Sequence, residues 1–147
     1  MRTLFFALTV CLITACGSSK SESTDTQTLE QYLEIKDALV ATDFNATQEA
    51  ANKMFSNELP AELKGPITAI ANSSTIADQR AAFEDLSVQM YQVVSANPVK
   101  GQMVYKQYCP MAFNNAGAYW LSTEEHVMNP YFGDMMLHCG SVQETIQ

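Results

Sequence analysis

The sequence predicts a mainly α-helical domain: a bundle of about three to four helices followed by a small C-terminal hairpin and loop module, with an α+β fold as the alternative. Apolar residues between positions 28 and 98 recur at three- and four-residue steps, bounded by capping residues and prolines. Residues 99–147 lack this periodicity and hold five of the eight methionines. We therefore expect one globular domain over 28–147, with 28–98 as the helical bundle and 99–147 as a Cys/Met/aromatic-rich module.

The first fifteen residues have the features of an export signal. Arg2 supplies a short basic start, and Leu4 to Ile13 form an apolar segment too short to span a bilayer. The run from Ile13 to Cys16, followed by Gly17, resembles the lipobox of a bacterial lipoprotein. We expect cleavage after residue 15 and lipidation of Cys16, with an ordinary secretory signal as the alternative.

The remaining chain is expected in the bacterial cell envelope, on the periplasmic side or the cell surface, and attached to a membrane by lipid alone. Residues 16–27 are rich in Ser, Thr and Lys, which predicts a flexible tether. Without Arg2, seven basic residues face sixteen acidic ones, a formal charge near −9. Such a charge excludes nucleic acid as a favoured partner.

Four helical segments are predicted before Pro98. The first runs from Thr28 to about residue 41, where Thr28 and Gln31 match a capping box. The second covers about 45–57. The third begins after Pro60 and is expected to break or kink at Gly65-Pro66.

The fourth helix has the clearest periodicity. Several candidate N-caps lie within 72–75, apolar residues follow at helical spacing, and the helix should end before Asn97. Beyond it, 102–108 and 118–121 are candidate strands joined by turn-forming residues at 114–117. A capping box at 122–125 predicts one helical turn.

Cysteine counting leaves two thiols for chemistry. Cys11 leaves with the signal and Cys16 is occupied by lipid, so Cys109 and Cys139 remain in a compartment that permits disulfides. Both lie close to methionines. Thiolate and thioether ligands select soft ions such as Cu(I), which makes a metal site the first hypothesis.

The spacing of the sulfur ligands supports that hypothesis. Cys109 and Met111 share one face if the backbone is extended, as Pro110 favours. Around Cys139 the candidate donors are Met135, Met136 and His138, and the sequence does not choose among them. Trp120 is a candidate to cap Cu(I) through its ring face, although packing is the commoner role of a tryptophan.

Four motifs, together with Gln79-Arg80 in the fourth helix, resemble a family of unknown function. That family occurs alone in bacterial lipoproteins and fused to periplasmic adaptor subunits of copper and silver efflux pumps. The resemblance implies heavy-metal handling, with Cys109, Met111, Met136 and Cys139 on the motif positions; Met128, Met135, His126 and His138 lie outside the pattern and are weaker candidates. The four motifs are Tyr108-Cys109-Pro110-Met111-Ala112, Gly117-Ala118-Tyr119-Trp120-Leu121-Ser122, Asn129-Pro130-Tyr131-Phe132-Gly133 and Met136-Leu137-xxx-Cys139-Gly140.

The sequence therefore leads to two hypotheses for a non-enzymatic protein. In the first, the four sulfur ligands bind Cu(I), or Ag(I), and pass it to an efflux or other copper-handling partner. In the second, Cys109 and Cys139 form a structural disulfide in a protein-interaction module without metal. An enzyme is not expected, because two histidines cannot supply a histidine-rich metal triad and no nucleophile elbow or phosphate-binding loop is present.

Overall fold

The computed structural model describes residues 19–147. The predicted signal peptide and the lipidation site Cys16 lie outside the described residues. Four long helices come first: α1 (Ser19–Val40), α2 (Phe44–Phe55), α3 (Ala61–Asn72) and α4 (Ile76–Ala96). Among the described residues, no helix combines the length and the apolar composition needed to cross a bilayer.

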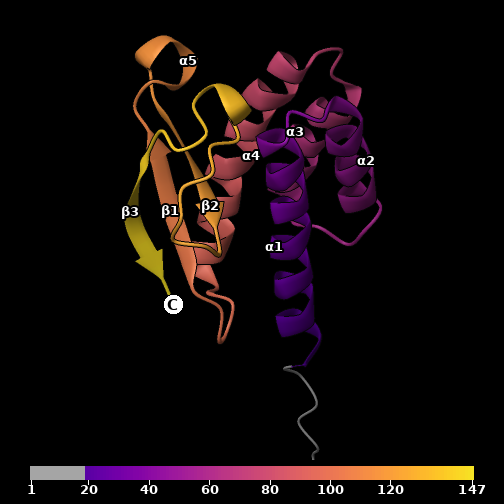
Figure 1. Ribbon diagram of the computed structural model, residues 1–147. Helices are drawn as coiled ribbons and strands as arrows, with labels where there is room; N and C mark the ends of the chain where they lie inside the picture. Colours follow the sequence, from indigo (N-terminus) through magenta and orange to yellow (C-terminus); the bar gives the residue numbers. More distant parts are fainter. Residues whose placement is uncertain (1–18) are drawn as a thin grey trace, which may run out of the picture.

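A three-stranded antiparallel sheet follows the helices (Figure 1). Its strands are β1 (Val104–Cys109), β2 (Ala118–Ser122) and β3 (Ser141–Ile146), in the order β2-β1-β3. Helix α4 contacts α3, α1 and the edge strand β2, so it joins the helical layer to the sheet. The fold is thus helix-dominated with a small sheet, as the α+β alternative describes.

Helix α1 begins earlier than the capping box predicts. It starts at Ser19, and Thr28 is a buried residue well inside it, so the prediction of Thr28 as N-cap is wrong. The physical reason is that neither glycine nor proline occurs between residues 18 and 40, so no residue interrupts the helix. Much of the segment predicted as a flexible tether is helical.

The predicted break in α3 is also wrong. Pro66 lies inside a continuous helix, in its second turn, where the missing N–H removes one early backbone hydrogen bond. The preceding Gly65 has no Cβ to clash with the ring of the proline that follows it, so the helical backbone is tolerated there. No other residue lies within 4 Å of the position that a Cβ on Gly65 would take. The limits of α4 are confirmed: the Thr75 hydroxyl accepts from the Asp78 amide at 3.1 Å, and the helix ends before Asn97.

Both predicted strands are confirmed as β1 and β2, whereas β3 was not foreseen. The predicted helical turn after Ser122 is wrong, because the Ser122 hydroxyl accepts from the Glu124 amide at 3.0 Å in a non-helical bend. Between β1 and β2 lies α5 (Ala112–Asn115), which contains a left-handed turn: φ is 49° at Phe113 and 57° at Asn114. This turn reverses the chain directly after Cys109.

Tyr32 connects the helices to the sheet. Its hydroxyl lies 2.8 Å from the Ser87 hydroxyl and accepts a hydrogen bond from the Leu121 amide at 3.0 Å. The ring is fully buried and stacks on Phe83, with ring centroids 5.2 Å apart. Burial raises the pKa of Tyr32, so the hydroxyl stays neutral.

Replacement of this hydroxyl tests the connection. We expect Tyr32→Phe to lower the free energy of unfolding by about 1–3 kcal/mol, because the buried Leu121 amide loses its acceptor. Urea denaturation measures the change. Tyr91→Phe is the matched control, since the Tyr91 hydroxyl bonds the Glu144 carboxylate in an exposed setting; an equal loss in both variants would contradict the role of Tyr32.

Candidate functional site

One face of the sheet is covered by the loop of residues 123–140, called here the covering loop. Gln107 and Trp120 are register partners, so with Cys109 two residues along they share this face. The indole of Trp120 packs on Tyr131 of the loop, with ring centroids 5.8 Å apart. Gly140 of the loop lies so close to the indole that a Cβ at this position would be only 3.1 Å from the ring. In Figure 1 the loop passes across β1 and β2.

Cys109 and Cys139 meet beneath the end of this loop and are called the cysteine pair. Cys109 ends β1 and is fully buried, whereas Cys139 is partly exposed; their sulfur atoms lie 2.8 Å apart and are not bonded. A disulfide requires about 2.05 Å between sulfurs. Two thiolates on one tetrahedral ion, each about 2.3 Å from it, lie about 3.8 Å apart. The pair thus stands between these two arrangements, and a shift of about 1 Å reaches either.

Asn129 holds the second cysteine in place. Its side-chain amide donates to the Cys139 carbonyl at 2.8 Å, while its side-chain oxygen accepts from the Tyr131 amide at 2.8 Å. Its backbone amide donates to the Leu137 carbonyl at 2.7 Å. Because Asn129 is fully buried, water does not compete for these bonds. The covering loop has two arms, one that contains Asn129 and one that contains Leu137 and Cys139. These bonds join the two arms next to the Cys139 thiol.

Two further polar residues attach the covering loop to the rest of the molecule. The side-chain amide of Gln107 donates to the carbonyls of Glu124 and Glu125 at 2.8 and 3.1 Å. The Arg80 guanidinium, from α4, donates to the Pro130 carbonyl at 2.9 Å. These contacts hold the loop against β1 at one point and against the helices at another.

The cysteine pair also affects its own ionisation. The pKa of Cys139 is raised, first by its hydrogen bond with Cys109, then by burial and by charge repulsion from Cys109. The backbone amide of Met111 hydrogen-bonds Cys139 and acts in the opposite direction. The two thiols therefore resist carrying two negative charges at once. A bound cation would offset this repulsion, and a sulfur–sulfur bond would remove both charges.

The methionines predicted as ligands contact the pair through their backbones, at Met111 and Met136. Met111 is 47 % exposed and Met135 is 75 % exposed, while Met136 is partly buried and its carbonyl accepts from the Cys139 amide at 3.1 Å. Trp120 is fully buried among Tyr131 and Gly140. The structure therefore brings together the two thiols and the backbones of Met111 and Met136.

The two histidines come together elsewhere on the covering loop. The rings of His126 and His138 are both exposed, with centroids 4.9 Å apart. Among the side chains that the structure describes, those of residues 26–147, no group of three or more His, Cys, Asp or Glu has the spacing of a metal site. A metal at the cysteine pair would therefore need thioether or external ligands to exceed two donors.

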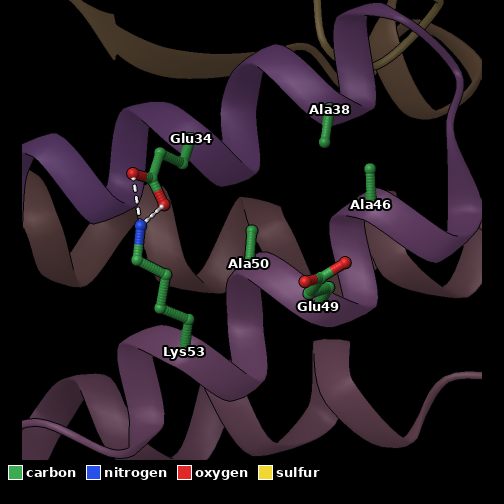
Figure 2. Close-up of a pocket in the computed structure, with 6 residues that line it drawn as sticks. All are labelled: Glu34, Ala38, Ala46, Glu49, Ala50 and Lys53. Carbon is green, nitrogen blue, oxygen red and sulfur yellow. Dashed lines mark hydrogen bonds and ion pairs between the residues drawn. The ribbon is translucent and has the colours of Figure 1, made fainter.

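Other hollows offer less chemistry. One hollow of about 280 Å³ lies between α1 and α2 and is lined by three alanines, Glu49, and the ion pair of Lys53 and Glu34. The nitrogen and oxygen of that ion pair lie 2.7 Å apart (Figure 2). Another of similar volume lies at Gly101 to Met103 beside Gln147. Neither gathers several buried polar groups around one point, which a specific ligand site requires.

Sequence reasoning missed the residues that position the pair. Asn129 belongs to one of the sequence motifs, but that motif does not predict the bond from its side chain to the Cys139 carbonyl. Gln107 was placed in a strand with no special role. Its signal was a polar amide on the apolar face of that strand, where a buried hydrogen bond is expected.

The fold and the site define a small, helix-rich α+β protein with two juxtaposed thiols, one at the end of β1 and one in the hydrogen-bonded covering loop. Residues 28–101 match the model of a family described as a protein of unknown function (DUF3347), and the chain belongs to that family. The matched region covers most of α1 and all of α2, α3 and α4, and it ends before β1, so the cysteine pair lies beyond it. No curated protein and no solved structure matches the chain.

Proposed function

We propose that this chain is a non-enzymatic metal-binding protein that takes up Cu(I), or Ag(I), at the cysteine pair. The observation that supports it is the 2.8 Å approach of the Cys109 and Cys139 sulfurs, from segments thirty residues apart. Thiolates prefer soft monovalent ions to the hard cations that the acidic surface would otherwise attract. The partly exposed Cys139 provides the route by which an ion enters.

Met111 and Met136 are the proposed additional ligands. Each has its backbone at the pair, through the Met111 amide near the Cys139 sulfur and the Met136 carbonyl on the Cys139 amide. Thioethers stay neutral, so they add donors without adding charge to two thiolates. Met135 is directed to solvent and Trp120 is enclosed in the core, which makes both less suited to a shared site.

The setting proposed for this activity is the bacterial cell envelope. A lipid on Cys16 would hold the domain at a membrane, and a copper-handling protein such as an efflux component would receive the ion. The export signal and lipobox in the sequence support this location, and the resemblance of residues 105–143 to the copper-associated family supports the partner. The exposed Met111 is suited to first contact with such a partner.

A structural disulfide is the second candidate function for the same pair. The short sulfur separation and the full burial of Cys109 favour it. Closure of a loop of about thirty residues would contribute roughly 3 to 4 kcal/mol in the chain-entropy model. The domain would then serve as an interaction module without metal.

Anaerobic titration of the reduced chain with Cu(I) tests the proposal. We expect one equivalent to bind, and Cys109→Ser or Cys139→Ser to weaken binding about a hundredfold or more, because one of two thiolate ligands is lost. Met103→Leu is the control: this methionine is exposed but lies before β1, at the opposite end from the pair. Equal affinity in wild type and Cys139→Ser would contradict the site.

X-ray absorption on the loaded chain determines the ligand set. Two sulfurs indicate the cysteine pair alone, and a third sulfur lost in Met111→Leu or Met136→Leu identifies the thioether. Mass spectrometry without reductant separates the second candidate. A chain two daltons lighter, which after reduction still takes up no Cu(I), would support the disulfide instead.

A further inference from the structure

The histidine pair, His126 and His138, lies on the covering loop outside the proposed sulfur site. Cys139 points to the sheet and meets Cys109, whereas the neighbouring His138 is exposed beside His126. The two rings come from the two arms of the loop, which Asn129 ties together through the Leu137 and Cys139 carbonyls. The hydrogen bonds of buried Asn129 therefore hold together the two backbone segments that carry the histidines.

The hydrogen bond of His138 determines which nitrogen is available. Its Nδ1 lies 2.9 Å from the Val127 carbonyl oxygen, and a carbonyl only accepts, so Nδ1 carries the proton and donates. The lone pair then resides on Nε2. Metal-binding histidines commonly have this arrangement, with one ring nitrogen donating to a backbone carbonyl and the other bound to the ion.

The separation of the rings fits two ligands of one ion. An imidazole nitrogen binds zinc at about 2.0–2.1 Å, which for ligand–metal–ligand angles of about 90–109° puts two ring centroids roughly 4.5 to 5.2 Å apart. The observed centroid separation is 4.9 Å, with the ring planes tilted by 55°. The exposed carboxylates of Glu124 and Glu125 precede His126 and favour a cation in this region.

We propose that His126 and His138 form a second metal site, for a borderline divalent ion and foremost Cu(II), with water or a partner's groups completing the coordination. Neutral imidazole suits such ions, and Cu(II) binds nitrogen ligands most tightly of the divalent first-row metals. The inference does not depend on metal binding at the cysteine pair, because its donors are imidazole nitrogens on exposed side chains and it uses neither thiol.

Electron paramagnetic resonance tests the site with Cu(II) added to the full chain in which all four cysteines are replaced by serine, so that no thiol is left to reduce the ion. We expect one equivalent with hyperfine coupling to two imidazole nitrogens. His126→Ala and His138→Ala should each weaken binding about tenfold or more and leave one coupled nitrogen. Met135→Leu, at an exposed residue of the same loop, should change neither.

Unchanged affinity in the histidine double variant, or a spectrum without coupling to two imidazoles, would overturn the proposal. If the serine variant fails to fold, as circular dichroism would reveal, the oxidised wild-type chain replaces it and the same outcomes apply. Cu(I) titration of the reduced His126→Ala chain separates the two proposals. Loss of Cu(II) binding with unchanged Cu(I) binding would show that the histidine site is separate from the cysteine pair. Loss of Cu(II) binding would support the histidine site even if the chain binds no Cu(I).

Discussion

Arg80→Leu is expected to destabilise the protein by about 3 kcal/mol, because three acceptors lose a charged donor. Besides the Pro130 carbonyl, the guanidinium donates to the Leu39 carbonyl at 3.3 Å and the Thr42 hydroxyl at 3.1 Å. The side chain is 8 % exposed, and burial lowers its pKa. The C-terminal end of α1 carries partial negative charge, which offsets part of that burial cost.

Urea denaturation followed by the fluorescence of the single tryptophan measures this loss. Thr42→Val is the control, since it removes one of the three acceptors and should cost about 1 kcal/mol. Arg80→Leu should also speed alkylation of the Cys139 thiol, because Pro130 is released and the covering loop loosens. A stability change below that of Thr42→Val would show that the guanidinium contributes little there.

Trp120→Ala is the second large effect, with an expected loss of about 3–5 kcal/mol from the cavity left under the covering loop. The indole is fully buried on the sheet face that the loop covers, against Tyr131 and Gly140. Trp120→Phe should cost less. It keeps most of the apolar contact and removes the buried indole N–H, for which no partner is found within the described residues.

Metal affinity in Trp120→Phe distinguishes the two roles predicted for this residue. If Trp120 is a packing residue, Cu(I) affinity stays within about twofold of wild type, because phenylalanine supports Gly140 from the same position. A cation–π cap would instead lose about tenfold, in line with an interaction of about 1 kcal/mol or more. Competition titration against a Cu(I) chelator measures the difference, with denaturation curves of both variants as the folding control.

The elements with strong local signals were predictable from the sequence. Helix α4 has a side-chain cap at Thr75 and a clear apolar period, and β1 and β2 are separated by turn-forming residues. The failures have local causes as well. Thr28 has the chemistry of a cap, but no glycine or proline before it stops the helix from starting earlier. Gly65-Pro66 resembles a break, but the proline falls in an early turn.

The sequence pointed to Cys109 and Cys139 as the residues of interest, and the structure brings their sulfur atoms close together. Which side chains meet depends on bonds between distant segments, and the sequence does not specify these. Arg80 and Pro130, fifty residues apart, are joined by one of them. The meeting of His126 with His138 likewise needs the two arms of the covering loop to be tied at Asn129, which no local pattern expresses.

The strand order has a consequence for the order in which contacts form. Neighbouring helices make contacts that are near in sequence, so the helical half is able to form before the sheet. The central strand β1 pairs with β3, where Val104 is opposite Ile146, forty-two residues further along the chain. Closing so long a segment costs more entropy than pairing adjacent helices, so we expect the two cysteines to meet after the helices have formed.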